Sequence, residues 1–279
     1  MPTQLQDTTT LHNGVKMPWL GLGVFLVEDG DEVIHSVKSA LKHGYKSIDT
    51  AAVYKNEKGV GQAIKESGVP REELFITSKV WNADQGYEST LQAFETSLDK
   101  LGLEYLDLYL IHWPVPEQAK YKETWKAMEK LYKDGKIRAI GVSNFKEHHL
   151  EDLIQDAEVK PMVNQVEFHP HLAQVELHEY CKKHGIQLEA WSPLKQGQLL
   201  DDPTLTKIAE KHGKSTAQVI IRWDLQSEVV TIPKSVKEQR IVANADVFDF
   251  ELSEEDMKAI NELNKEERVG PDPDEMNRV

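Results

Sequence analysis

The chain has 279 residues, of which 39% are hydrophobic and 29% charged, so it has enough apolar material for a large core. This length is near that of one (β/α)8 barrel and too long for a small sandwich. The net charge of -14 disfavours a nucleic-acid partner, because nonspecific binding to DNA depends on clustered lysine and arginine.

Short apolar strands alternate with amphipathic helices along the whole sequence. Near the start, Asn13-Gly14 separates two short runs and predicts a β-hairpin, because a type I′ turn needs positive φ at both central residues. The elements predicted after it are, in order, strand 20–23, helix 31–44, a strand at 47, a helix after 57, a strand at 74, helix 90–101, a strand at 107, helix 121–133, strand 137–142, a helix after 146, strand 162–166, helix 175–184, strand 186–191, helix 216–225, strand 229–232 and helix 254–263.

Eight strand-helix repeats without a strong linker favour a closed parallel barrel over an open doubly wound sheet. We therefore predict an α/β fold, a (β/α)8 TIM barrel. It forms a single domain over residues 1–279, of which 264–279 are a short polar tail.

Three successive predicted strands end in a side chain that can move or polarise a proton. Asp49, Lys79 and His112 close these strands, and Tyr54 lies on the loop after the first of them. Any one of these residues is more often a turn residue, a solvated strand end or a packing residue. Parallel barrels place their chemistry at the carboxyl ends of the strands, so we predict that the four side chains form one site.

The residues around this set closely resemble those of the aldo-keto reductase family. The resemblance rests on residues 44–51 (Gly-Tyr-Lys-Ser-Ile-Asp-Thr-Ala), Tyr54 with Asn56-Glu57, Lys79, and residues 105–114, and it extends from about residue 10 to about residue 263. The chain is most similar to the short bacterial members that reduce glyoxal, methylglyoxal or 2,5-diketo-D-gluconate. The resemblance also implies that the hairpin closes the bottom of the barrel.

The chemistry of carbonyl reduction gives each residue of the set a role. Hydride addition builds negative charge on the carbonyl oxygen, so the site must supply a proton and donors aimed at that oxygen. We predict Tyr54 as the acid, with Lys79 lowering its pKa from the usual value of about 10. Asp49 would keep Lys79 charged, and His112 would orient the carbonyl as a neutral donor. The resemblance implies substrate contacts from Phe25, Trp81, His112 and Trp113.

A phosphate site is predicted near the end of the chain. Residues 232–235 end a strand, a helix is predicted to begin near Ser235, and two cations stand close to that start. The resemblance implies that Lys234, Ser235 and Arg240 bind the 2′-phosphate of NADPH, and that Asn244 binds its adenine. Two cations at a second phosphate imply a preference for NADPH over NADH.

The resemblance implies further cofactor contacts on three other strands. Two positions depart from the family pattern, namely Trp191, where tyrosine is common, and Ala243, where glutamate or glutamine contacts adenine. The implied contacts are Ser143, Asn144 and Gln165 at the nicotinamide carboxamide, Trp191 stacked on the ring, and Ser192 and Leu194 beside the pyrophosphate.

No metal site is predicted. The pairs His148-His149 and His169-Pro170-His171 have no carboxylate or thiolate company of the kind that a zinc site needs. The single Cys181 excludes an internal disulfide and fits a reducing compartment. Residues 1–7 lack the basic and apolar regions of a signal peptide, and no apolar run could cross a bilayer. We expect a cytoplasmic monomer without a membrane partner.

The predicted activity is NADPH-dependent reduction of small aldehydes and ketones, with 2-oxoaldehydes first. The tail 270–279 is too short and hydrophilic for a large specificity loop, so an open, permissive pocket is expected. Alternatives are a reductase of diketogluconate-type sugar ketones, a slow-turnover regulatory protein that binds NADPH, and a metal-dependent barrel hydrolase.

Overall fold

The computed structural model describes residues 1–279, and its centre is a ring of parallel strands. Neighbouring strands follow chain order around the sheet. The ring closes where Leu20 pairs with Thr231 and Gly23 pairs with Lys234, so the first strand joins the last. The predicted (β/α)8 barrel is thereby confirmed. Its strands are β3 (Leu22–Gly23), β4 (Ser47–Asp49), β5 (Phe75–Val80), β6 (Leu106–Ile111), β7 (Ile137–Ser143), β8 (Val163–Glu167), β9 (Gln187–Trp191) and β10 (Val230–Thr231).

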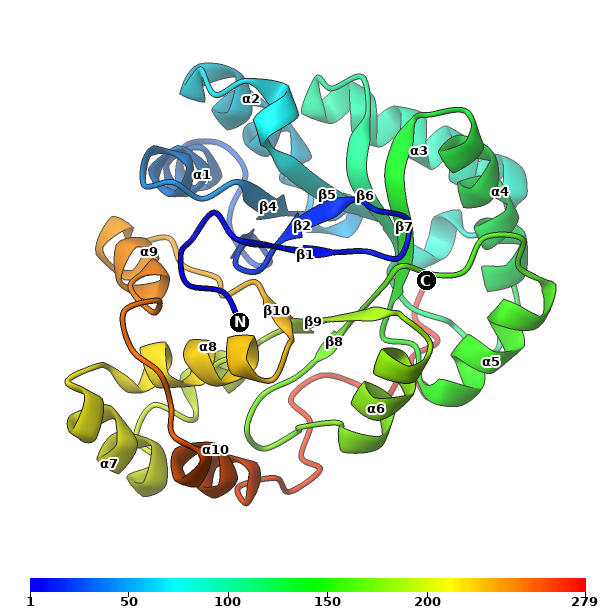
Figure 1. Ribbon diagram of the computed structural model, residues 1–279. Helices are drawn as coiled ribbons and strands as arrows, with labels where there is room; N and C mark the ends of the chain where they lie inside the picture. The colour runs from blue at the N-terminus through cyan, green and yellow to red at the C-terminus, as the bar shows by residue number, and fades with distance from the viewer.

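The helices surround this ring (Figure 1). One of them, α7, is absent from the sequence prediction, although Asp202 caps it and Pro203 occupies its first turn, which is a typical helix start. The helices are α1 (Asp31–Lys42), α2 (Glu57–Ser67), α3 (Tyr87–Leu101), α4 (Tyr121–Lys133), α5 (Glu147–Asp156), α6 (Val175–Lys183), α7 (Pro203–His212), α8 (Thr216–Gln226), α9 (Glu238–Ala245) and α10 (Glu254–Asn261).

The core lies inside the ring and between the ring and the helices. A single cluster of 62 buried hydrophobic residues spans both layers. Every residue of β5 and β6 is buried, as expected for parallel strands covered on both faces. A charged side chain in such a strand needs a partner, and this requirement shapes the site described below.

An antiparallel hairpin of β1 (Thr8–Thr10) and β2 (Lys16–Pro18) lies across the barrel end that faces the viewer in Figure 1. Asn13 anchors it by donating to the carbonyl of Arg138 at 3.0 Å. The turn is not the type I′ turn that the sequence suggested. Only Gly14 has positive φ (90°), and its amide donates to Leu11, so the loop has three residues with glycine in the left-handed position.

The helix predicted near Ser235 begins three residues later. The Ser235 hydroxyl accepts a hydrogen bond from the amide of Lys237 at 3.3 Å, and Lys237, the N-cap of α9, has an extended backbone. A serine that bonds the backbone two residues on forms a turn that competes with helix. Lys234 and Ser235 therefore precede α9, whereas Arg240 and Asn244 lie within it.

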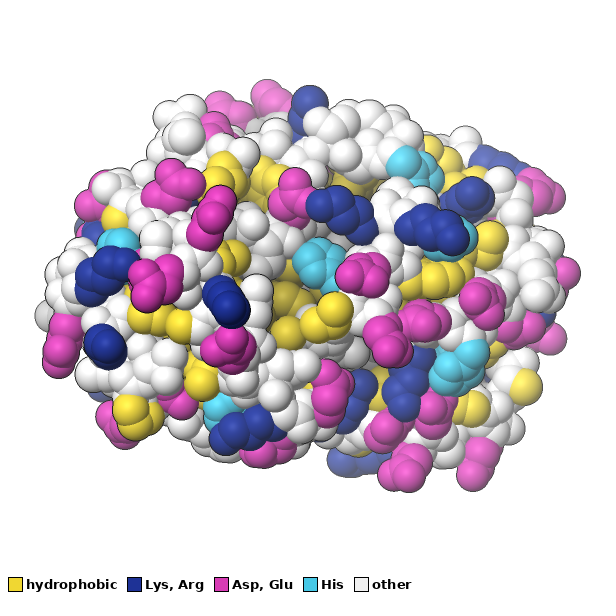
Figure 2. Space-filling view, turned by 60° about the horizontal axis from the view of Figure 1, so that its bottom comes forward, with side chains coloured by type: hydrophobic (Ala, Val, Ile, Leu, Met, Phe, Trp, Pro, Cys, Tyr) yellow, Lys and Arg dark blue, Asp and Glu magenta, His cyan; other side chains and the backbone are white.

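The surface carries acidic and basic side chains side by side. Figure 2 shows both signs interleaved on one face, with hydrophobic side chains in small groups between them and in a shallow central hollow. None of the helices combines the length and the apolar character that crossing a membrane requires.

Candidate active site

Three of the four predicted catalytic side chains form one hydrogen-bonded group at the carboxyl ends of neighbouring strands. The Lys79 ammonium donates to Asp49 Oδ1 at 2.6 Å and to the carbonyl of Thr50 at 3.1 Å. It also lies 3.3 Å from the Tyr54 hydroxyl. Lys79 and Asp49 come from β5 and β4, and Tyr54 ends the 3-10 turn Ala52–Tyr54 that follows β4.

Aromatic rings enclose the Tyr54 phenol. The centroid of the His112 ring lies 5.7 Å from that of Tyr54 and 5.3 Å from that of Trp81, both edge-on. Phe25 lies 5.2 Å from Tyr54 and is 48% exposed, so it stands at the mouth of the site. Trp113 is nearly buried and stacks on none of these rings, so its contact with substrate stays a prediction.

Lys79 is held in its charged form despite complete burial. Burial alone favours the neutral amine, but the charge of Asp49 and the hydrogen bond to it outweigh this effect, and the pKa of Lys79 is raised above its usual value. The prediction that Asp49 keeps Lys79 charged agrees with this direction.

The expected lowering of the Tyr54 pKa is wrong as a net effect. Burial raises the pKa of the phenol, and this contribution exceeds the opposite contribution of Lys79, so the pKa lies above its usual value. Tyr54 is therefore a neutral phenol with a proton to donate over the whole neutral range. The neighbouring charge of Lys79 is visible in the sequence, whereas the burial of the phenol depends on the folded barrel.

His112 is a neutral imidazole. Burial, followed by the charge of Lys79, lowers the pKa of His112 well below its usual value. Its Nδ1 is buried without a hydrogen-bond partner. A buried N–H without an acceptor is rarer than an unpaired acceptor, so the tautomer with the proton on Nε2 is favoured. This tautomer matches the predicted role of His112 as a neutral donor.

The residues predicted at the nicotinamide are connected to the catalytic group by hydrogen bonds. Asn144 Nδ2 donates to the carbonyl of His112 at 2.9 Å, and Trp191 Nε1 donates to Asn144 Oδ1 at 2.8 Å. Ser143 donates to the carbonyl of Gln165 at 2.7 Å. Asn144 and Ser192 have positive φ, at 62° and 48°. Such strained residues concentrate at functional sites, and these two follow β7 and β9 directly. Leu194, part-buried, begins the next turn.

The residues predicted at the 2′-phosphate lie where β10 leads into α9. Lys234 and Arg240 are exposed, and Ser235 and Asn244 are buried. Glu238, the acidic residue in the first turn of α9, pairs with Lys42 and His43 instead of neutralising either cation. The two positive charges are therefore available to an anion.

A sequence profile described as "Aldo/keto reductase family" matches residues 20–265. The chain belongs to the aldo/keto reductase family. It is 74% identical to the glyoxal reductase of Bacillus subtilis over 276 residues, 99% of each chain. It is 49% identical to the methylglyoxal reductase DkgA of Escherichia coli, over 95% of this chain and 96% of that one. A solved structure of a Gox0644 mutant in complex with NADPH superposes with a TM-score of 0.93 at 47% identity, over 97% and 98% of the two chains.

The tail of this family member folds back onto the carboxyl-end face of the barrel, so the expectation that the tail leaves the pocket open needs correction. The amides of Val269 and Gly270 donate to the Glu167 carboxylate at 2.7 and 2.9 Å. Further along, the carbonyl of Arg278 accepts a hydrogen bond from Asn82, directly after Trp81, at 2.7 Å. Hydrogen bonds at both ends hold the tail along the rim of the site.

Gly270 packs so closely on Trp191 that no side chain fits there. A Cβ at this position would lie 2.4 Å from Trp191 Cη2.

We expect Gly270→Ala to displace either the tail or the indole, and thereby to raise the KM for carbonyl substrate and to speed trypsin cleavage after Arg268. Limited proteolysis and steady-state kinetics would measure both effects, with the exposed tail change Glu275→Ala as control. If Gly270→Ala leaves both the cleavage rate and the KM unchanged, the close packing of Gly270 on Trp191 does not hold the tail in place.

The sequence reasoning missed the carboxylate beside His148-His149. Asp274 in the tail lies 2.7 Å from His148 Nε2 and 3.1 Å from His149 Nε2, and the three side chains form a group with metal-ligand spacing. However, Lys146 also pairs with Asp274 at 2.7 Å, and its amide donates to His149 Nδ1 at 3.0 Å. That bond places the His149 proton on Nε2, toward Asp274. The group is therefore explained as a set of polar contacts that fasten the tail to α5.

Two other buried groups were also missed. Lys195 follows Leu194 directly, is buried and contacts His171 and Glu267, so its charge is already paired. Glu189 lies inside the barrel beside Gln165. The only sign of this group in the sequence is that Glu189 is an acidic residue among the apolar residues of β9. The sequence prediction gave the strand and assigned no role to Glu189.

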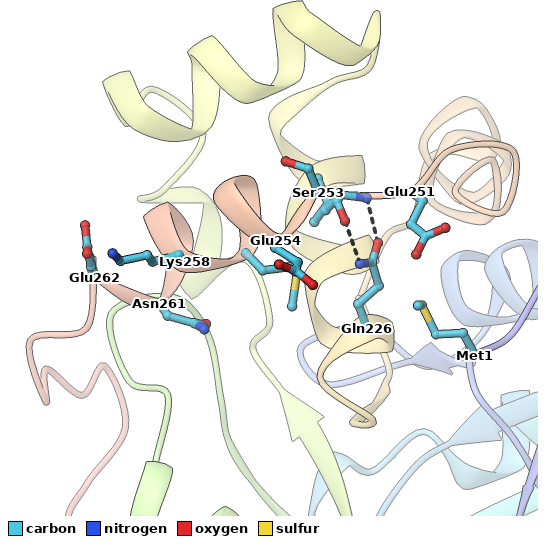
Figure 3. Close-up of a pocket in the computed structure, with 10 residues that line it drawn as sticks. Met1, Gln226, Glu251, Ser253, Glu254, Lys258, Asn261 and Glu262 are labelled. Atoms are coloured by element: carbon cyan, nitrogen blue, oxygen red, sulfur yellow. Dashed lines mark hydrogen bonds between the residues drawn. The ribbon is translucent and has the colours of Figure 1, made fainter.

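A surface hollow also lies away from these residues. Its volume is about 910 Å³, and it lies between the N-terminus, the end of α8 and α10 (Figure 3). Gln226 on its wall exchanges two hydrogen bonds with the backbone of Leu252. None of the predicted site residues lines this hollow, so it is separate from the candidate active site.

Proposed function

We propose that the protein reduces small aldehydes and ketones to alcohols with NADPH, and that 2-oxoaldehydes such as methylglyoxal and glyoxal are its preferred substrates. The observation that carries the proposal is the buried chain from Asp49 through Lys79 to Tyr54, with neutral His112 beside it. The names of the relatives from Bacillus subtilis and Escherichia coli support the substrate class.

The side chains present fit NADPH at both of its ends. At the nicotinamide end, Gln165 uses its amide nitrogen within the protein, and its Oε1 accepts no hydrogen bond from the chain. Asn144 and Ser143 lie beside it. At the other end, Lys234 and Arg240 carry unneutralised charge next to the buried Ser235. When bound, NADPH supplies the hydride.

The protein's own residues then control the proton. The carbonyl oxygen would lie between the Tyr54 hydroxyl and His112 Nε2, two donors that meet its growing negative charge. Tyr54 gives its proton to that oxygen, and Lys79 stabilises the phenolate that remains. Asp49 holds Lys79 charged and in place. The general acid contributes about 10²- to 10⁴-fold in rate in such sites.

The substrate class follows from the wall of the site. Phe25 and Trp81 present aromatic surface beside the donors, and neither carries a charge that would recognise a long polar chain. Apolar walls with two convergent donors suit a short carbonyl compound.

The proposed activity is tested by NADPH oxidation, followed by absorbance, with methylglyoxal, glyoxal and a diketogluconate. We expect kcat/KM to be highest for the 2-oxoaldehydes. A higher value for the diketogluconate would overturn the substrate ranking alone. Turnover of no substrate, together with tight retention of NADPH, would instead identify a regulatory protein.

Removing one phosphate-site cation is expected to weaken NADPH binding selectively. Arg240→Ala should raise the KM for NADPH by about 10- to 100-fold, since one charge-assisted contact contributes about 1.5–3 kcal/mol, and should leave the KM for NADH unchanged. Steady-state kinetics with both cofactors would show this, with Lys258→Ala, an exposed cation on α10, as control. An equal rise for NADH would place Arg240 away from the 2′-phosphate.

We also propose that residues 1–279, the tail 264–279 included, act as one domain in a cytoplasmic monomer. The single hydrophobic cluster that spans ring and helices supports the first part, and a buried free Cys181 fits a reducing compartment. Sedimentation equilibrium would test the oligomeric state, and a mass of twice the chain would refute it.

A further inference from the structure

Glu189 places a second carboxylate inside the barrel, next to the catalytic group. It lies on β9, paired with Gln165 on β8 and Val230 on β10, and is 1% exposed. Its Oε2 accepts a hydrogen bond from Gln165 Nε2 at 2.9 Å. The same nitrogen donates to Asp49 Oδ2 at 2.8 Å. A continuous path therefore runs from Glu189 through Gln165 and Asp49 to Lys79.

This arrangement fixes which way the Gln165 amide points. A primary amide has two N–H donors, and here the Asp49 carboxylate accepts one and a carboxyl oxygen of Glu189 accepts the other. A flipped amide would bring its oxygen against the ionised Asp49 carboxylate, which is repulsive. The two carboxyl groups together therefore keep Oε1 free on the side away from them.

We propose that Glu189 is a positioning residue. It orients the Gln165 amide toward the cofactor and, through the shared nitrogen, steadies Asp49 beside Lys79. This inference rests on the proposed function, in which Gln165 contacts the nicotinamide carboxamide. Removing the partner that orients a metal-ligating side chain typically costs about 10- to 100-fold in affinity or activity, and we expect an effect of the same order here.

The charge balance of the site decides the protonation state of Glu189. Asp49 and Lys79 already form a neutral pair, so an ionised Glu189 would be an unpaired buried charge. Burial, followed by the charge of Asp49, raises the pKa of Glu189 to about 8. The titratable groups that face it are Asp49 from β4, Lys79 from β5 and Tyr54 from the turn after β4, whereas its partner on β10 is the apolar Val230.

Glu189 is therefore mostly protonated at neutral pH and gains a negative charge above about pH 8. That charge raises the pKa of Tyr54 further and makes the phenolate harder to form. Stability changes in the same window. Between the ordinary glutamate pKa and about 8, the unfolded chain releases a proton that the folded chain keeps, so Glu189 lowers stability as pH rises through this range.

Three variants test whether Glu189 orients the Gln165 amide or is merely a buried carboxyl group. Glu189→Gln keeps an acceptor for the Gln165 N–H and cannot ionise. Glu189→Leu removes the acceptor. Asp224→Asn is the matched control, because Asp224 is also a buried carboxyl with a raised pKa, but it bonds Thr231 between α8 and β10, away from the catalytic group.

The experiment measures the dissociation constant of NADPH by tryptophan fluorescence, the melting temperature, and the pH profile of kcat with methylglyoxal. We expect Glu189→Leu to weaken NADPH binding by about tenfold or more, and Glu189→Gln to restore it to within about threefold of wild type. The alkaline decline of kcat should move to higher pH in Glu189→Gln. Asp224→Asn should change neither the NADPH affinity nor the pH profile of kcat. As pH rises, the melting temperatures of Asp224→Asn and of Glu189→Gln should both increase relative to that of the wild type.

Wild-type NADPH affinity in a folded Glu189→Leu would overturn the inference. If that variant fails to fold, an unshifted alkaline limb in Glu189→Gln overturns it instead. A wild-type protein that neither binds nor oxidises NADPH would overturn the proposed function itself. Normal wild-type activity together with unaffected Glu189 variants would overturn only the inference about Glu189.

Discussion

Replacing Tyr54 by phenylalanine is expected to lower kcat for carbonyl reduction by about 10²- to 10⁴-fold. The substitution removes the only phenolic proton beside Lys79 and keeps the ring that packs between Phe25 and His112. NADPH binding should stay at its wild-type value, because the predicted cofactor contacts lie on other strands. Steady-state kinetics and fluorescence titration with NADPH measure the two quantities separately.

The control for this change is Tyr45→Phe. Tyr45 is buried and its hydroxyl donates to the carbonyl of Ile241 in α9 at 2.7 Å, so the variant loses one hydrogen bond away from the catalytic group. It should lose about 1 kcal/mol of stability and keep its kcat. A Tyr54→Phe protein that retains more than about a tenth of the wild-type kcat would show that another group donates the proton.

Replacing Lys79 by methionine is expected to lower the free energy of unfolding by about 3–5 kcal/mol at neutral pH. The change leaves Asp49 buried, with its Oδ1 deprived of the ammonium at 2.6 Å. An uncompensated buried carboxylate is costly, although the hydrogen bond from Gln165 to Oδ2 remains. Activity should fall as well, because nothing is left to stabilise the Tyr54 phenolate. Urea denaturation measures the loss of stability.

The double variant Asp49→Asn with Lys79→Met separates the two effects. Neutralising the stranded carboxylate should restore much of the stability that Lys79→Met loses, while kcat stays low. If the double variant is no more stable than Lys79→Met alone, the buried charge is not the source of the loss. If it regains activity, Lys79 does not stabilise the phenolate.

The barrel and the catalytic set followed from sequence because both depend on local pattern and chain order. Alternating short strands and helices specify parallel pairing, and parallel pairing brings the ends of neighbouring strands to one face. Asp49, Lys79 and His112 could therefore be placed together from their positions alone.

The details that sequence reasoning missed depend on contacts between distant parts of the chain. The net pKa of Tyr54 depends on how much of the barrel covers it. The contact of Asp274 with His148 joins residues 126 positions apart, and that of Glu167 with Gly270 joins residues 103 apart. No periodicity encodes such pairs. The start of α9 was misplaced for a local reason, the turn at Ser235, whose signal is weaker than that of a helix cap.

Deuterium transfer from NADPH to the carbonyl carbon tests directly whether the protein is a reductase with Tyr54 as its acid. Wild-type protein would be incubated with methylglyoxal and NADPH that carries deuterium in place of both hydrogens at the reactive carbon of its nicotinamide, and the product would be analysed by mass spectrometry. We expect the wild type to yield an alcohol with one deuterium on the former carbonyl carbon, and the Tyr54→Phe variant to yield almost none of this product. Alcohol without deuterium, or equal labelled product from Tyr54→Phe, would contradict this expectation.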